Sequence, residues 1–302
     1  MKEIIAPVEK SLLREEFSRA TELEEASRGN IKVFCVDASF PSILRETGRL
    51  REIAFRAGGG GTGMELDLDK YDTDPAFKFK QLVVWDANDE AIAGGYRFVY
   101  GRDILLKEDG QPDIPSAHIF RFSPAFMKEV MPVTMELSRS YIVEQHQRVS
   151  DDARKSIFIL DCLFKGISIV TRDGGIENIF GKVTFYPGYP AEAFALLTAF
   201  MKKHCDGGPA VSAINEYPTA EAPQAEQLFT HDDYKADFRE LNKALLSRGM
   251  YLPPILKSYM NLTATLKYYG AALNDEFGNV VEMAIKLHMP DINPERWPLY
   301  FK

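Results

Sequence analysis

Apolar residues in the first half of the chain follow two different spacings. In residues 42–58 an apolar side chain recurs at about every third or fourth position, the period of an amphipathic helix, and four glycines at 58–61 end the pattern. β-Branched and aromatic residues fill shorter runs at 32–37, 81–89 and 91–101, and an Asp/Asn-rich turn separates the last two. The pattern therefore predicts a strand, a helix and an antiparallel hairpin, in that order.

The second half alternates between strand-like and helix-like segments. The predicted elements are a strand at 133–143, a helix at 154–175, a strand at 176–190, helices at 191–205 and 233–249, and a β-like tail at 280–289. This order predicts a mixed α/β (α+β) fold, with a central twisted sheet flanked by helices, rather than a doubly wound parallel sheet. We expect one domain over residues 1–302, with a core at about 30–217, a surface linker at about 216–233 and a C-terminal extension at about 234–302.

Six charged residues lie inside or beside apolar runs in the first half of the chain. They are Arg51, Asp69, Asp72, Arg97, Glu136 and Arg139, in the motifs LREIAF, DKYD, GGYRF and ELSRSYIV. A buried charge destabilises the fold unless it is paired. Three acids and three bases in apolar surroundings therefore predict one shared polar site, which is where catalysis is expected.

ELSRSYIV leaves two interpretations of its acid open. In a regular strand Glu136, Ser138 and Ser140 share one face, so Glu136 meets Arg139 only if a bulge breaks the alternation. Glu136 is then either part of a structural ion pair at a strand edge, or a general base whose pKa is raised by burial in a partly apolar cleft. The glycines at 58–61 also have two interpretations: they allow close backbone approach to a ligand, or they form a mobile loop.

Composition narrows the classes of function. A hydrophobic content of 45% is ample for a core, and a net charge of -8 argues against a nucleic-acid binder. The three cysteines are widely spaced, without a CxxC motif or a nearby histidine pair, which predicts neither disulfides nor a metal site and fits a reducing cytoplasm. The sequence contains no GxGxxG or P-loop motif and no apolar run of roughly 20 residues, so we expect no nucleotide loop and no transmembrane segment.

The charged motifs resemble those of a known family. LREIAF, DKYD, GGYRF and ELSR occur in the order and rough spacing of acyl-homoserine-lactone synthases, which belong to the GNAT N-acyltransferase superfamily. Later segments, including LPPILKSYMNLTATLKYYGAALNDEFGN and INPERWPLYF, resemble a sister group more closely: the hemolysin-like bacterial acyltransferases that make ornithine and glycine lipids. The resemblance covers about 40–302 and implies the GNAT acyltransferase fold.

That family transfers an acyl group from a phosphopantetheine thioester to the amine of an amino acid. Because a protonated amine is not a nucleophile, a base must remove its proton, and the resemblance makes Glu136 the candidate base and Arg139 the arginine that holds the charged network together. The pantetheine is expected in a V-shaped opening between splayed parallel strands at about 134–143 and 178–186, where backbone N–H groups polarise the carbonyl.

The resemblance also assigns binding residues. On the side of the amine substrate they are Arg51, Phe55, Asp69, Asp72, Arg97 and Ser138, and on the side of the donor they are Ser140, Ile142, Arg148, Arg154 and Lys155. Arg51 or Arg97 pairs either with the carboxylate of the acceptor or with Asp69 and Asp72. The loop that carries Arg148 lacks the usual glycine-rich phosphate nest, which suits acyl carrier protein better than coenzyme A. No metal and no permanently bound cofactor is expected.

Carrier proteins are acidic, so their docking surface should be basic. The candidate residues are Arg148, Arg154, Lys155, Lys165, Arg172, Lys182, Lys202 and Lys203, and the alternative is ordinary solvated helix surface. We therefore expect a cytoplasmic enzyme, or one peripheral at the inner membrane, that moves a fatty (3-hydroxy) acyl group from acyl carrier protein to glycine or ornithine in the first step of amino-lipid synthesis. The alternatives are an acyl-homoserine-lactone synthase and a non-catalytic GNAT scaffold that binds acyl carrier protein or lipid.

Overall fold

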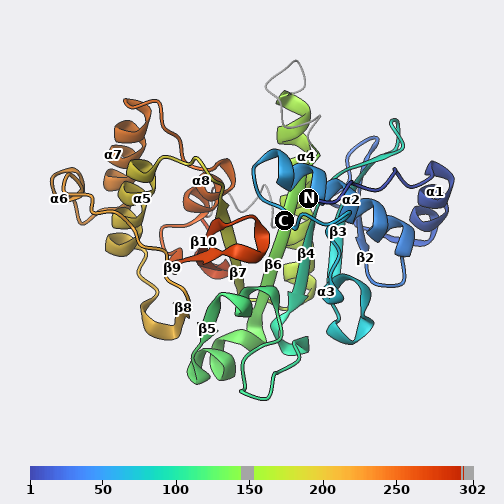
Figure 1. Cartoon of the computed structure of the whole chain (residues 1–302), viewed down its shortest axis with the longest axis horizontal. Coiled ribbons are helices and arrows are strands. Elements are labelled where there is room, and N and C mark those ends of the chain that lie inside the picture. The colour runs from blue at the N-terminus through green and yellow to red at the C-terminus, as the bar shows by residue number, and fades with distance from the viewer. Residues whose placement is uncertain (144–152, 294, 296–302) are drawn as a thin grey trace.

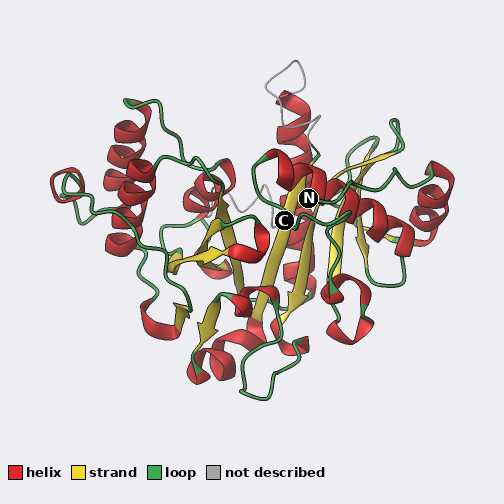
Figure 2. Cartoon of the chain, viewed as in Figure 1, coloured by secondary structure: helices red, strands yellow, loops and turns green. Residues whose placement is uncertain are grey.

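A mixed sheet forms the centre of the molecule (Figures 1 and 2). In the computed structural model, which describes residues 1–143, 153–293 and 295, eight strands lie in the order β1-β2-β3-β4-β6-β7-β10-β9. They are β1 Thr21–Glu22, β2 Ile31–Val36, β3 Lys80–Asp86, β4 Ala91–Tyr100, β6 Thr134–Ile142, β7 Asn178–Phe185, β9 Lys267–Asn274 and β10 Val280–His288. β6 and β7 run parallel, and the other neighbours are antiparallel. Two short strands, β5 (Phe120–Phe122) and β8 (Val211–Ala213), pair separately.

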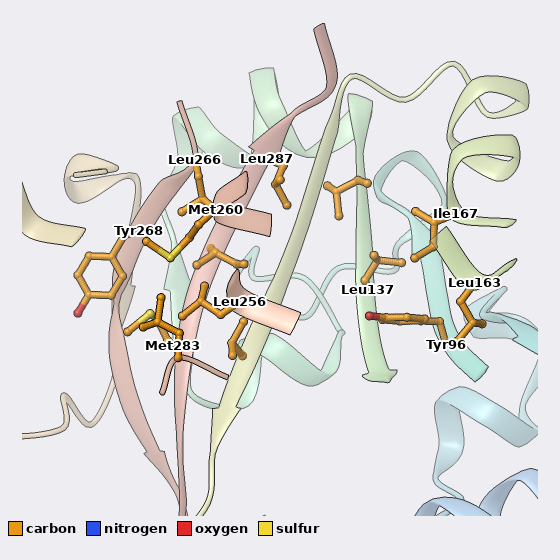
Figure 3. Close-up of a cluster of buried hydrophobic side chains, with 14 of the residues drawn as sticks. Tyr96, Leu137, Leu163, Ile167, Leu256, Met260, Leu266, Tyr268, Met283 and Leu287 are labelled. Carbon is orange, nitrogen blue, oxygen red and sulfur yellow. The ribbon is translucent and has the colours of Figure 1, made fainter. Parts of the chain in front are cut away.

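Helices cover both faces of this sheet. They are α1 Lys10–Arg19, α2 Pro41–Ala57, α3 Lys70–Thr73, α4 Ala153–Asp173, α5 Ala191–His204, α6 Ala225–Leu228, α7 Tyr234–Leu246 and α8 Pro254–Leu262. On one side, here the helix face, α4, α5 and α8 share a large apolar cluster with the strands (Figure 3). On the other side, here the site face, α2 and irregular segments between residues 101 and 133 lie against the strands. No described helix is long and apolar enough to cross a membrane.

The start of α2 is held by a side chain from α1. Pro41 occupies the first turn, where a missing N–H is harmless. The carboxylate of Glu16 accepts hydrogen bonds from the backbone N–H groups of Ser42 at 3.0 Å and Ile43 at 2.8 Å. An acceptor at this position satisfies N–H groups that have no partner within the helix. This contact fixes the first turn of the helix that carries Arg51 to α1.

The element pattern predicted from the sequence is confirmed. Each predicted strand and helix is present, with ends that differ by at most five residues, and the mixed sheet is the predicted fold class. The C-terminal extension adds β9 and β10 to the same sheet, beside β7. Within the predicted linker at 216–233, α6 forms one helical turn and Phe229 is buried in the large apolar cluster.

Candidate active site

The parallel strands β6 and β7 diverge and leave an opening in the sheet. Their pairing runs from Thr134 opposite Asn178 to Leu137 opposite Gly181 and goes no further. Figure 3 shows the strands separating, with Tyr96 extending from β4 toward the gap. A cavity of about 170 Å³ occupies the opening. The predicted V-shaped opening is therefore present at the predicted pair of strands.

The cavity passes through the sheet and has two kinds of wall. Its site-face wall, here the polar compartment, includes Ser138, Arg139, Lys182, Thr184 and Glu282. Its helix-face wall, here the apolar compartment, includes Tyr96, Leu137, Ile179, Val183, Ile255 and Tyr259. A polar reactant and an aliphatic chain can therefore meet in the gap between β6 and β7.

A β-bulge in β6 turns Arg139 toward the polar compartment. Arg139 and Ser140 together lie opposite Tyr96 in the pairing with β4, and the backbone of Arg139 has a φ of 52°. Regular alternation would place Arg139 on the helix face. Instead its Nε lies 2.8 Å from Oδ2 of Asp67, and its guanidinium stacks on the ring of Phe277 at 4.6 Å. The bulge considered from the sequence is present, but it does not pair Arg139 with Glu136.

Glu136 is a buried carboxylate with one occupied oxygen. Its Oε1 accepts hydrogen bonds from the hydroxyl of Ser116 and from the backbone N–H of Ser116 at 3.1 Å. Its Oε2 is buried and has no hydrogen-bond partner among the described residues. Burial raises the pKa of Glu136, and Ser116, Lys182 and Arg97 only partly oppose this. Glu136 does not itself line the cavity, but Ser138, two residues further along the strand, and Pro115, which precedes Ser116, do. Its role as a base stays a prediction.

The arginines Arg51 and Arg97 pair with the acids of DKYD. Arg97 Nη1 lies 2.7 Å from Asp69 and 2.9 Å from Asp72, and Arg51 Nη1 lies 3.1 Å from Asp72. Arg51 also donates to Gln81 at 2.5 Å. Burial alone would raise the pKa of Asp72, but the two arginines hold it well below its usual value. Of the two pairings left open by the sequence, the one within the protein is present.

Local sequence explains why these charges meet. On α2, Arg51 follows Ile43 and Thr47 at intervals of four residues, so it lies on the buried side of the helix. Asp69 and Asp72 form a capping box on the one-turn helix α3: Asp69 accepts from the N–H of Tyr71, and Asp72 accepts from the N–H of Asp69. The same two oxygens, Asp69 Oδ1 and Asp72 Oδ2, also accept from Arg97, and the other oxygen of Asp72 accepts from Arg51.

Comparison with known proteins identifies the family. Residues 50–152 match the family described as an acetyltransferase (GNAT) domain. A protein from Bacteroides thetaiotaomicron named glycine N(alpha)-acyltransferase is 38% identical over 97% of this chain and 87% of its own length. One of the same name from Phocaeicola vulgatus is 36% identical over 97% of this chain and 90% of its own. The chain belongs to this family of GNAT acyltransferases.

Solved structures similar to this acyltransferase are distant from it. An N-acyl amino acid synthase from uncultured soil microbes aligns with a TM-score of 0.40 and 10% identity, over 86% of this chain and 92% of its own. A coenzyme A-dependent acyl-homoserine lactone synthase aligns with a TM-score of 0.39 and 14% identity, over 88% of this chain and 85% of its own.

The other predicted site residues of the acyltransferase are divided between the cavity and its surroundings. Phe55, Ser138 and Ser140 line the cavity. Ile142 does not line it and instead packs against the large apolar cluster. Arg148 lies outside the described residues. Arg154 and Lys155 begin α4, but their side chains lie outside the description, so the predicted phosphate site stays a prediction.

The basic residues expected at a carrier-protein surface are only partly available. The prediction is wrong for Lys182, whose side chain is 8% exposed and pairs with Glu282 at 2.6 Å in the cavity wall. Lys203 is engaged by Asp237 at 3.0 Å, and Arg172 pairs with Glu25 and Asp173. Pattern alone could not reveal these partners, because each acid except Asp173 is distant in sequence.

The glycines at 58–61 pack against the cavity rim. A Cβ added at Gly60 would lie 2.9 Å from the ring of Tyr186, which lines the cavity. The turn that follows the run wraps the buried carboxylate of Glu52, which accepts from the N–H groups of Thr62 at 3.0 Å and Gly63 at 2.8 Å. These N–H groups bind an internal carboxylate and so do not form a nest for an external anion.

Sequence reasoning missed four polar residues of this region. They are Asp67, Gln81, Ser116 and Glu282. Glu282 carried the same signal as the predicted residues, because it is an acid in the apolar run VVEMAIKL. Among the described residues, no three His, Cys, Asp or Glu side chains are grouped so that they could hold a metal ion.

Proposed function

We propose that this acyltransferase moves a fatty acyl group from a thioester to the amine of glycine. Two features support the proposal: the two relatives named glycine N(alpha)-acyltransferase, and a buried carboxylate, Glu136, with one unoccupied oxygen beside a cavity that has a polar and an apolar wall. The observation that carries the chemistry is Glu136 itself, because acylation of an amine requires a base with a raised pKa at that place.

The reaction then proceeds in the gap between β6 and β7. The thioester lies in the opening. Beyond Leu137 and Gly181 the two strands no longer pair. The backbone N–H groups that face the opening there have no strand to bind, so they can polarise the carbonyl. Glu136 accepts a proton from the amine, directly or through a water molecule. Once this proton has passed to solvent, the amine nitrogen attacks the carbonyl carbon, a C–N bond forms and the C–S bond breaks. The second proton that the nitrogen loses as the amide forms passes to the departing thiolate.

The two substrates and the product each belong to a defined chemical class. The donor is a fatty, 3-hydroxyacyl chain on the phosphopantetheine of acyl carrier protein, with acyl-coenzyme A as the second possible carrier. The acceptor is glycine rather than ornithine, as the names of the relatives suggest. The product is an N-acylglycine, which would serve as the first intermediate of a membrane amino lipid.

Turnover with defined substrates tests the proposal. Purified enzyme is incubated with 3-hydroxypalmitoyl acyl carrier protein or 3-hydroxypalmitoyl-coenzyme A and with glycine, ornithine or S-adenosylmethionine, and products are identified by mass spectrometry. We expect N-acylglycine. Formation of an N-acylornithine or an acyl-homoserine lactone would mean that the acceptor is not glycine. If a folded enzyme forms no amide product, the proposed function is refuted.

The variant Glu136→Gln tests the role of the base. Loss of a general base lowers kcat by about 100-fold to 10,000-fold, while the variant should stay folded, with a melting temperature no lower than that of the native protein near neutral pH. Glu129→Gln is the matched control, because Glu129 is exposed and remote from the cavity wall. Native turnover in Glu136→Gln would show that another group removes the proton.

A further inference from the structure

The polar compartment contains a buried ion pair that the reaction so far does not use. Lys182 on β7 and Glu282 on β10 lie 2.6 Å apart, with side chains 8% and 6% exposed, and both line the cavity. Glu282 also accepts a hydrogen bond from Asn274 at 3.1 Å. A buried pair of this kind adds little to stability compared with apolar residues of the same volume. Its position in the cavity wall therefore points to a role in binding.

Arg139 adds a second cation to the same compartment. Its Nε is taken by Asp67, whereas its two Nη atoms have no hydrogen-bond partner among the described residues. The ammonium of Lys182 has three N–H donors, of which Glu282 occupies one. The compartment thus offers N–H donors from two cations, and one carboxylate that accepts. By contrast, Arg51 and Arg97 are fully buried, pair with Asp69 and Asp72, and do not line the cavity.

We propose that Arg139, Lys182 and Glu282 bind the acceptor as a zwitterionic α-amino acid. The substrate carboxylate lies against Arg139 and Lys182, and its ammonium group approaches Glu282. This inference rests on the proposed function, because it assigns the acceptor subsite of that reaction. A charge-assisted contact at each end fixes the amine relative to the thioester.

The two acids of the site then have separate tasks. Burial alone would raise the pKa of Glu282, but Lys182 holds it below its usual value. Glu282 therefore stays ionised and attracts an ammonium group without removing its proton. Glu136 has a pKa that burial raises, so it is the better proton acceptor. Different environments assign binding to one carboxylate and proton transfer to the other.

The walls of the compartment favour the smallest amino acid. The aromatic rings of Phe55, Tyr186 and Phe277 line it on the side of α2 and the glycine run. Among the described residues that line the cavity, Glu282 is the one acid. The second ammonium group of ornithine would therefore have no carboxylate to pair with, and leaving a charge unpaired in a buried site is unfavourable. Glycine has neither a side chain to place nor a second charge.

Acceptor analogues test the subsite. Initial rates are measured at saturating acyl donor with glycine and with glycinamide, which keeps the amine but lacks the carboxylate. Native enzyme should have a KM for glycinamide at least about tenfold above that for glycine, because a hydrogen bond to a charged group contributes a factor of about ten or more. Lys182→Met should raise the KM for glycine by a larger factor than the KM for glycinamide, because glycine alone loses a contact to its carboxylate, whereas the change at Glu282 affects the amine of both.

Two further variants keep the test decisive. Lys286→Met is the matched control, because Lys286 lies on β10 but pairs with Asn178 and does not line the cavity. If Lys182→Met alone does not fold, the double variant with Glu282→Leu removes both charges, and it should bind glycine weakly by isothermal titration calorimetry.

Equal effects of Lys182→Met on glycine and glycinamide, or native binding of glycine by the folded double variant, would overturn the subsite. Failure of the native enzyme to acylate either amine would instead refute the proposed function, so the two failures are distinguishable.

Discussion

Asp72→Asn should destabilise the acyltransferase by about 3–5 kcal/mol, because breaking a buried ion pair leaves its partner uncompensated. Asp72 lies between two arginines with no solvent exposure, Arg51 at 3.1 Å and Arg97 at 2.9 Å. It also accepts from Gln81 at 2.7 Å. Asparagine has nearly the same size, but it removes the negative charge and replaces one acceptor with an N–H donor. The loss is a large part of a typical folding free energy of roughly 5–15 kcal/mol.

Urea denaturation followed by circular dichroism at pH 7 measures this loss. The control is Asp109→Asn, the same chemical change at an exposed pair with Arg121, where solvent screening should leave stability close to native. Equal losses in the two variants would refute the reasoning, since burial would then make no difference to the value of the pair. Native stability in Asp72→Asn would refute it as well.

The ion pairs of Asp72 with Arg51 and Arg97 also predict how the stability of the protein depends on pH. The pKa of Asp72 is lower in the folded protein than in the unfolded chain, where it is about 3.9. Its contribution is therefore complete above the unfolded value and is lost as pH falls through the folded value. The stability difference between native enzyme and Asp72→Asn should stay constant from neutral pH down to about pH 5 and narrow below about pH 4.

The remaining predictions concern the cavity. Ser116→Ala removes the hydroxyl hydrogen bond that lowers the pKa of Glu136 and keeps the one from the backbone N–H, so the acidic limb of kcat/KM should move to higher pH, and an unmoved limb would count against Glu136 as the base. Tyr259→Ala enlarges the apolar compartment, where the hydroxyl of Tyr259 lies 3.1 Å from that of Tyr96. Competition between acyl donors should then favour chains longer by about two carbons or more, whereas Tyr259→Phe should keep the native preference.

The strands and helices were predictable because their apolar patterns are local. Residues 42–58 and 154–175 follow a helical period, and α2 and α4 form there. The order of strands could not be obtained in this way. β10 pairs with β7 although the two segments are about 100 residues apart, and no local period encodes such a pairing.

The charged cluster was predictable because a charge in an apolar run signals burial with a partner. Arg51, Arg97 and Asp72 are buried and paired as that signal implies. The identity of other partners was not predictable. Arg139 pairs with Asp67, which lies in the irregular segment before DKYD, because a bulge reverses the direction of its side chain. A bulge depends on the fit between two strands, which a single strand's sequence does not specify.

Glu136 should make folding less favourable as pH rises, in the opposite sense to Asp72. Burial raises its folded pKa above the usual value, so between the unfolded and folded values the native state binds more protons, and stability falls with increasing pH. Glu136→Gln removes this dependence.

Between pH 4 and pH 9, the stability of Glu136→Gln relative to native enzyme should therefore rise where the pH lies between the unfolded and folded pKa values of Glu136, by about 1.4 kcal/mol for each pH unit that separates the two. Urea denaturation across that range measures it, with Glu129→Gln as the control. A flat difference would mean that the Glu136 carboxylate is solvated or paired in the native state. A rising one would mean that the fold tolerates an unfavourable buried carboxylate at the position where the reaction requires a base.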